Sequence, residues 1–159
     1  MLKMKEEYKS LFSIAHDHFQ GMMVAQMIKE GGQPIPGFSD TPEGKAKYVV
    51  HFYNIELANH FYIEEYILQP LVRGFSAEID KIFDEIIDEH KLIENLVESL
   101  KDGDGLSIKL NNLGKALEAH IKKEEQVLFP KIQETLSVFE LENLAKKLRD
   151  NGYEYIYRY

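Results

Sequence analysis

The chain has 159 residues, enough for one domain with a sizeable apolar core. It contains no cysteine, which excludes disulfides, zinc fingers, thiolate iron–sulfur ligation and cysteine nucleophiles, so any metal must take imidazole or carboxylate ligands. A formal charge of −8, spread along the chain, argues against nucleic acid or an anionic membrane as partner. No signal-peptide pattern opens the chain and no stretch approaches the ~20 apolar residues of a membrane span, so we expect a cytoplasmic protein.

Apolar residues recur at spacings of three and four along four long segments, which predicts amphipathic helices and an all-α fold. Glycines and prolines mark the ends of these segments. The predicted long helices cover about 6–30, 42–70, 76–101 and 106–136, and a short fifth helix begins with the capping pair Ser137 and Glu140 and ends near Gly152. Pro130 is expected to kink the fourth helix.

The connections at 71–75 and 102–105 are short, so consecutive helices should lie antiparallel. We therefore predict an up-down four-helix bundle domain over residues 1–152, with the short fifth helix at its end. A tyrosine-rich tail, 153–159, follows and has no functional interpretation.

The first helix carries two candidate metal ligands, His16 and His18. They lie ~200° apart around a regular helix, so they cannot both face the core. His18 continues an apolar stripe that includes Met22 and Ala25, and we favour it over His16.

The second and fourth helices share an eleven-residue motif, H-x-x-x-E-E-x-x-L-x-P, beginning at His60 and at His120. A histidine and a glutamate four residues apart lie ~40° apart around a helix, so His60 with Glu64, and His120 with Glu124, each present two ligands from one face. The heptad stripes place these pairs toward the core and continue to Ile67 and Val127.

The third helix carries His90 at the equivalent mid-helix position of its stripe. Glu94, four residues later, is either a further ligand or a solvated side chain. His51 lies nine residues before His60, roughly on the opposite face, and is expected in solvent.

Six ionisable side chains in an apolar core would be costly unless they were paired or coordinated to cations. The alternative is that these side chains form hydrogen-bonded polar pairs in the core. This would explain any one of them, but it explains all six together less well than metal binding does. Mixed nitrogen and oxygen ligands in this number suit two iron or manganese ions, whereas zinc commonly needs four ligands. The Glu-x-x-His motif of ferritin-like di-iron proteins is absent, as are zinc-protease, phosphate-loop and haem-attachment motifs.

At these residues the chain resembles the hemerythrin-like domain family, whose members are di-iron four-helix bundles, over about 11–136. The form H-x-x-x-E-E-x-x-L-F-P around His120 is the most specific part. The resemblance implies two non-haem iron ions joined by an oxo or hydroxo group, with Glu64 and Glu124 bridging them. It also implies that the terminal iron ligands are His18, His60, His90 and His120.

The sequence departs from the oxygen-carrying members of that family at two places. These carry a second histidine where this chain has Glu94, and they carry H-x-x-x-x-D where it has Glu124-Glu125. The resemblance is therefore to bacterial members with four histidines and two glutamates, a group associated with nitric oxide response and iron-centre repair.

Our leading hypothesis is a di-iron protein that binds a small diatomic ligand, O2 or NO, for sensing, storage or stress response. One rival is a di-iron oxidoreductase acting on O2, peroxide or NO, with Tyr53 or Glu65 as proton source. Others are iron delivery or repair of damaged iron centres, and a metal-free interaction bundle. Metal analysis separates the last from the rest.

Overall fold

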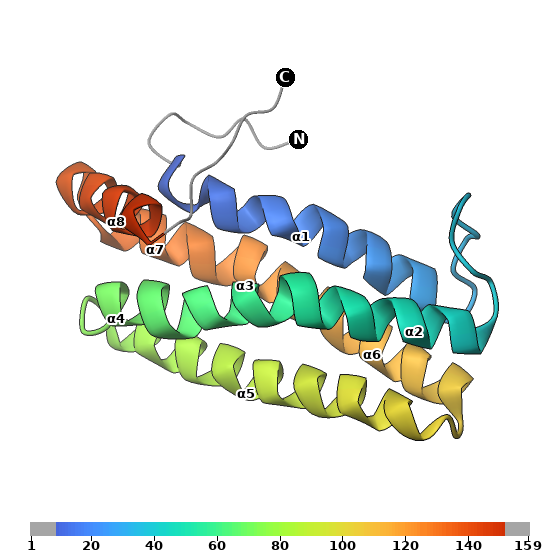
Figure 1. Cartoon of the computed structure of the whole chain (residues 1–159). Coiled ribbons are helices and arrows are strands. Elements are labelled where there is room, and N and C mark those ends of the chain that lie inside the picture. Colours follow the sequence, from blue (N-terminus) through green and yellow to red (C-terminus); the bar gives the residue numbers. More distant parts are fainter. Residues whose placement is uncertain (1–8, 152–159) are drawn as a thin grey trace.

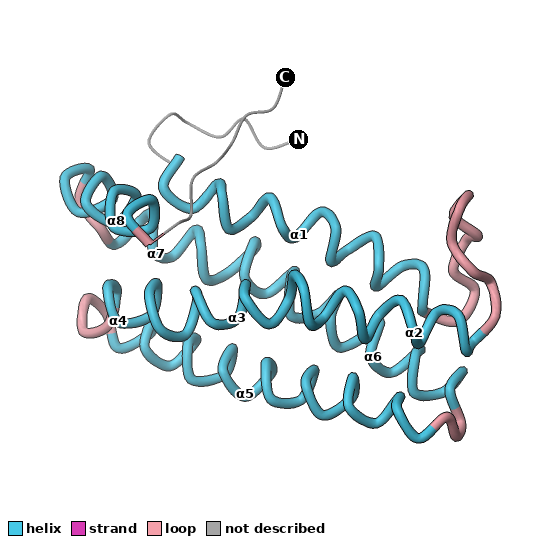
Figure 2. The backbone as a smooth tube through the Cα atoms, viewed as in Figure 1, coloured by secondary structure: helices cyan, strands magenta, loops and turns pink. Residues whose placement is uncertain are grey.

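A computed structural model describes the backbone of residues 9–151 and the side chains of residues 17–151. All regular structure in this range is helical, and no β-strand occurs within it, which confirms the all-α prediction (Figure 2). The elements are α1 (Lys9–Ile28), α2 (Pro42–Phe52), η2 (Tyr53–Leu57), α3 (Ala58–Ile63), η3 (Glu64–Leu68), α4 (Gln69–Val72), α5 (Ala77–Ser99), η4 (Leu100–Asp102), α6 (Leu106–Lys123), η5 (Glu124–Leu128), α7 (Phe129–Thr135) and α8 (Val138–Asp150). The tail at 153–159 lies outside the described residues.

Four helical rods form a bundle (Figure 1). Two of them are single helices, α1 and α5, and the other two are continuous runs that we call the α2–α4 rod (42–72) and the α6–α7 rod (106–135). In Figure 1 the chain changes direction at each connection between rods. The helix α1 packs mainly on α6, and α5 also packs on α6, while α8 crosses one end of the bundle and contacts α1 and η3.

Side-chain caps fix the start of three helices, including the one predicted from Ser137 and Glu140. The hydroxyl of Thr41 accepts a hydrogen bond from the Gly44 amide, with Pro42 in the first turn. Ser76 caps α5 in a similar way. Ser137 and Glu140 form the complete capping box at the start of α8. These caps satisfy amides that would otherwise lack partners, so they determine where each helix begins.

The two copies of the repeated motif share a wide, π-helical turn. It spans Glu64–Leu68 in η3 and Glu124–Leu128 in η5, and in each a backbone amide bonds the glutamate carbonyl five residues earlier. A proline follows two residues later, at Pro70 and Pro130. Proline has no amide hydrogen and its ring crowds the preceding turn, so a wider turn accommodates it without ending the helix. The helix therefore continues through Pro130.

The wide turns correct one part of the predicted core. A π-helical turn adds one residue, so the side chains after it are displaced by one position from the heptad stripe. Val127, predicted to be buried, is 46% exposed, and Leu128 is fully buried in its place. In the other copy Ile67 is only half-buried, whereas Leu68 is fully buried. The stripe was wrong beyond each glutamate because it assumed a regular helix.

The core consists of two apolar clusters separated along the bundle axis by a polar layer. The first apolar cluster gathers buried apolar side chains within 24–28, 46–61, 93–100 and 106–121. The second apolar cluster gathers those within 63–86 and 128–148, including the inner face of α8. The polar layer lies between them in the four rods and consists of His18, His60, Glu64, His90, His120 and Glu124.

Within residues 9–151, no helix has both the length and the apolar character needed to cross a membrane.

Candidate metal centre

All six predicted ligands lie in the polar layer and are at most 3% exposed. Each rod contributes at least one histidine to the layer, and the two rods with the repeated motif each add a glutamate. The same cluster that the sequence predicts is thus assembled from four separate segments, with side chains converging from all sides of the bundle.

The six side chains divide into two groups that could each hold one cation. Each group offers four ligand atoms that all lie within 4.8 Å of one another. Both groups contain Glu64 and Glu124, and they differ in their histidines. We call them the His18–His60 half and the His90–His120 half. A pair of carboxylates common to both halves is the arrangement expected for two bridged metal ions.

The distances within the layer show how closely the ligand atoms approach. The carboxylate of Glu64 spans the two halves, with Oε1 3.1 Å from His60 Nε2 and Oε2 3.2 Å from His90 Nε2. The carboxylate of Glu124 does the same, with Oε2 2.8 Å from His18 Nε2 and Oε1 3.2 Å from His120 Nε2. Each glutamate therefore faces one histidine of each half.

These close approaches do not satisfy the atoms involved. Among the described residues, the buried side-chain oxygen and nitrogen atoms without a hydrogen-bond partner are both oxygens of Glu64, both oxygens of Glu124, and the Nε2 atoms of His90 and His120. Leaving such atoms unpaired in a core costs several kcal/mol in total, on the order of 1–3 kcal/mol for each group. Cations at the centre of the layer would satisfy all of them, so the donor set fits metal binding.

The imidazole pair of the His18–His60 half supports the same conclusion. The two Nε2 atoms lie 3.2 Å apart, while the Nδ1 atom of each ring faces a carboxylate. When Nδ1–H donates to that carboxylate, Nε2 carries a lone pair. Two lone pairs that face each other at this distance require a positive charge between them.

Without metal, protons take the place of the cations. Burial by itself lowers the pKa of His90, but the carboxylates of Glu124 and Glu64 beside it raise that pKa to about 10. Burial likewise opposes protonation of His18, whose pKa is raised to about 9 by Glu124 and Glu125. The carboxylates of the layer thus favour positive charge on their neighbours. Metal ions would supply this charge and release the protons from the histidines when they bind.

A second set of carboxylates surrounds the layer and contacts the outward Nδ1 atoms. In the His18–His60 half, His18 Nδ1 lies 3.2 Å from Glu125 Oε1 and His60 Nδ1 lies 3.2 Å from Asp17 Oδ2. A carboxylate on the far nitrogen of a ligand histidine fixes its tautomer and ring orientation and increases its basicity. This contact prepares Nε2 to bind a metal.

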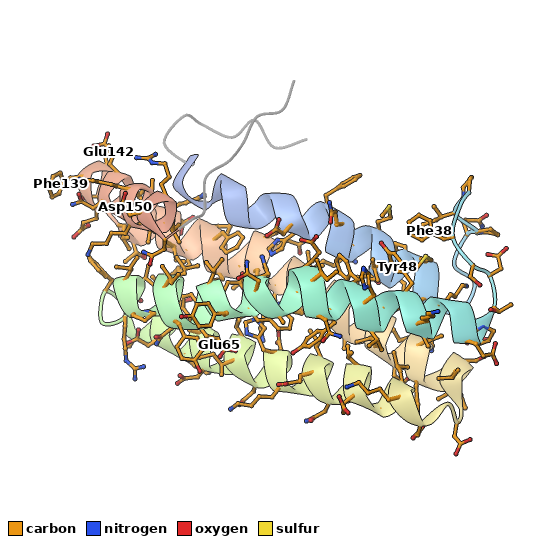
Figure 3. The ribbon with its side chains drawn as sticks, in the orientation of Figure 1. Phe38, Tyr48, Glu65, Phe139, Glu142 and Asp150 are labelled. Carbon is orange, nitrogen blue, oxygen red and sulfur yellow. The ribbon has the colours of Figure 1, made fainter. Side chains whose placement is uncertain are left out.

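The His90–His120 half has the same outer contacts. Its His90 Nδ1 lies 2.7 Å from Glu65 Oε1, which extends between the α2–α4 rod and α5 (Figure 3). Its His120 Nδ1 lies 3.1 Å from Glu89 Oε2, and Glu89 also accepts a hydrogen bond from Lys123 at 2.6 Å. All four histidines of the layer are therefore oriented by carboxylates.

The outer carboxylates connect neighbouring rods in a closed ring. Each carboxylate belongs to one rod and contacts the layer histidine of a neighbouring rod. The contacts run from Asp17 in α1 to His60 in α3, from Glu65 in η3 to His90 in α5, from Glu89 in α5 to His120 in α6, and from Glu125 in η5 to His18 in α1. The sequence analysis considered only Glu65, as a proton donor, and missed the ring. A signal was available, because each outer carboxylate is the chain neighbour of a ligand: Asp17 of His18, Glu65 of Glu64, Glu89 of His90 and Glu125 of Glu124.

Several other candidates lie outside the layer. Glu94 and His51 are exposed, and neither belongs to the two ligand groups. Tyr53 is half-buried, and burial together with Glu94 and Glu65 raises its pKa, which makes it a weaker acid. The side chain of His16 lies outside the described residues, whereas that of His18 is placed in the layer.

The comparison with protein families identifies the same region. Residues 16–132 match the hemerythrin HHE cation-binding domain, so this chain belongs to that family. The family description indicates that the domain binds cations, and the two buried ligand groups at the centre of the bundle could hold them. No curated protein and no solved structure matches the chain significantly.

Proposed function

We propose that this protein is an antiparallel up-down four-helix bundle that holds two non-haem iron ions and binds a small diatomic ligand, O2 or NO, for sensing, storage or stress response. The observation that carries the proposal is the pair of buried ligand groups that share Glu64 and Glu124. Neutral imidazoles with carboxylates suit iron, and bound iron supplies the electrons that bind O2 or NO, which side chains cannot supply.

The ligand count favours an open coordination site. Two six-coordinate ions need about twelve ligand atoms. The polar layer offers at most eight, the Nε2 atoms of four histidines and the oxygens of two carboxylates. Positions therefore remain for small exogenous ligands, as in metal sites that bind or activate them.

A small cavity next to the layer gives such a ligand room. It has a volume of about 10 Å³, enough for roughly one water-sized molecule. Its walls include Asp17, His18, Gly21, His60 and His120, so it reaches the ligands of the layer from the side of the first apolar cluster. The small size of this space excludes a large organic substrate.

Visible spectroscopy tests the proposal. The iron-loaded protein is reduced without oxygen and then exposed to O2 or NO. We expect a new absorption band with either or both gases, since a bound ligand changes the charge-transfer spectrum of the iron. An unchanged spectrum in the fully iron-loaded protein would contradict diatomic binding.

A cavity variant sharpens this test. At Gly21 an added Cβ would lie 2.9 Å from Ile121 Cδ1, the end of a flexible side chain, so Gly21→Ala should fold while reducing the space beside the layer. We expect the iron content to stay unchanged and diatomic binding to become slower or weaker. Equal binding rates in the two proteins would show that the ligand does not use this cavity.

A further inference from the structure

We infer that Lys123 is a positioning residue for the metal centre: acting through Glu89, it orients His120 and raises the reduction potential of the bound iron. The inference rests on the proposed di-iron centre. It adds a residue outside the ligand set that favours the reduced state of the iron, the state that takes up O2 or NO in the proposed function.

A continuous chain of contacts links Lys123 to a histidine of the layer. Lys123 Nζ donates a hydrogen bond to Glu89 Oε1 at 2.6 Å, and the other oxygen of that carboxylate, Oε2, lies 3.1 Å from His120 Nδ1. The same ammonium group lies 2.8 Å from Glu85 Oε2. Lys123 follows His120 by three residues in α6, and Glu89 follows Glu85 by four in α5, so each pair shares one helix face.

These contacts fix the carboxylate of Glu89. Each of its oxygens has a partner of its own, so the carboxylate cannot rotate without losing a contact to Lys123 or to His120. The side chains of Lys123 and Glu89 are only 27% and 28% exposed, which limits competition from water. The orientation of the His120 ring, whose Nε2 faces the layer 3.2 Å from Glu124 Oε1, therefore depends on Lys123.

Lys123 also changes how strongly His120 donates electrons to a metal. A carboxylate on the Nδ1 side makes an imidazole more basic and a stronger donor. The ammonium group of Lys123 balances part of the charge of Glu89, so this carboxylate polarises His120 less. A weaker donor stabilises the ferric ion less, which raises the reduction potential.

The surroundings of the layer explain why a positive charge matters here. Glu64 and Glu124 lie within the layer, and the ring of four outer carboxylates contacts its histidines. Negative charge stabilises the more highly charged ferric state, and a cation placed against the ring opposes that preference. Lys123 therefore shifts the balance of the centre toward the ferrous state.

The repeated motif indicates that the fold does not require a lysine at this place. Lys123 is the third residue after His120, and the third residue after His60 is Ile63, which is 5% exposed and belongs to the second apolar cluster. An apolar side chain is thus compatible with the wide turn that follows in the other copy of the motif. A methionine at position 123 should therefore leave the bundle folded.

Redox titration of the iron-loaded full chain tests the inference. Lys123→Met removes the charge and keeps an extended side chain. It should change the one-electron equilibrium constant at least about tenfold, the lower end of the range for contacts to ligand histidines, which lowers the reduction potential by about 59 mV. Lys123→Arg keeps the charge and should restore a potential close to that of the wild type.

Two further variants separate the route through Glu89 from a general effect of charge. Lys122→Met is the matched control, because it removes the same charge from the neighbouring residue, which pairs with Glu118 instead, and it should leave the potential nearly unchanged. Glu85→Gln removes a negative charge from Lys123 without removing the contact to Glu89, so it should shift the potential upward, opposite to Lys123→Met.

The outcomes separate this inference from the proposed function. If Lys123 only joined α5 to α6, Lys123→Met would unfold at lower urea concentration and keep the wild-type potential. That result, an equal shift in Lys122→Met, or a downward shift in Glu85→Gln would overturn the role of Lys123 and leave the di-iron centre intact. Uptake of fewer than two iron ions by the wild-type chain would overturn the di-iron centre and this inference with it.

Discussion

The polar layer and the first apolar cluster are adjacent in the same four rods and equally buried, yet different interactions stabilise them. Leu110 and Leu117 of the cluster are 2% and 1% exposed and need only close packing, worth roughly 25 cal/mol per Å² of apolar surface. His90 and Glu64 of the layer are 3% and 1% exposed, and their burial is costly unless charge is balanced. The comparison teaches that metal content and fold stability can be changed separately.

The largest effect should follow removal of a shared carboxylate. Glu124 belongs to both ligand groups, so Glu124→Ala should reduce the iron content from about two ions per chain to near zero, because each ion loses a ligand and the bridge. Elemental analysis measures the iron, and circular dichroism checks that the variant remains helical.

Glu94 offers a matched control for that substitution. It also follows a histidine of the layer by four residues, but it is exposed and outside both groups. Glu94→Ala should keep its iron. Iron loss in this variant, or retention of both ions by Glu124→Ala, would break the distinction between buried ligands and solvated glutamates.

The next largest effect should occur where the two regions meet. Phe61 is 5% exposed, belongs to the first apolar cluster and stacks on His90. Truncation of a buried phenylalanine leaves a cavity, so Phe61→Ala should lower the free energy of unfolding of the metal-free protein by about 3–5 kcal/mol. Urea denaturation measures the loss.

The neighbouring residue gives the control for Phe61. Tyr62 is 55% exposed and, among the residues that the structure describes, stacks only on Tyr66, so Tyr62→Ala should change the free energy of unfolding by less than about 0.5 kcal/mol. If the two variants were equally stable, the packing assigned to Phe61 would be wrong.

A smaller loss of stability, without loss of metal, is expected at Gly114. A Cβ there would lie 2.8 Å from the backbone oxygen of Ala25, so α1 and α6 would have to separate. Overpacking costs about 1–3 kcal/mol, which exceeds the ~1 kcal/mol that alanine gains over glycine in a helix. Gly114→Ala should therefore unfold at lower urea concentration than wild type and keep its full iron content.

Asn112, exposed on the same helix, provides the comparison for Gly114. Its replacement by alanine should not reduce stability. Loss of iron in Gly114→Ala would show that the polar layer depends on the packing of the apolar cluster, and would contradict the separation proposed above.

The smallest effect concerns an ion pair on the surface near the first apolar cluster. Lys122 and Lys29 lower the pKa of Glu118 from 4.5 to about 2. A carboxylate whose pKa is lower in the folded than in the unfolded chain stabilises the fold at pH values above the unfolded-state pKa. This stabilisation is lost as the pH falls from about 4.5 toward 2. Solvent screening limits the contribution to at most about 1 kcal/mol.

Glu118→Gln isolates this contribution. The stability difference between wild type and variant should be largest near pH 7 and should shrink as the pH falls toward 2, measured by urea denaturation of the metal-free proteins. A difference that stays constant over this range would show that the ion pairs do not stabilise the fold.

The sequence predicted which polar side chains gather in the buried layer because each lies on an otherwise apolar helical stripe. His60 and Glu64 required only regular helical spacing between them, which the structure retains. The predicted burial of Val127 was wrong, because a regular helical period does not include the extra residue of the π-helical turn before Pro130.

The outer ring was missed for a different reason. Asp17 and Glu125 are partly exposed, and their role depends on which rod lies beside which, information that a single helical pattern does not contain. The ion pair between Lys123 and Glu89 was equally out of reach, because the two residues meet only in the folded bundle.

Elemental analysis of the chain purified without chelators tests the central claim most directly. The account predicts about two iron ions per chain, held by the buried side chains that Glu64 and Glu124 join into two groups. A folded, monodisperse protein that takes up no iron, even when supplied with Fe²⁺ under reducing conditions, would contradict it.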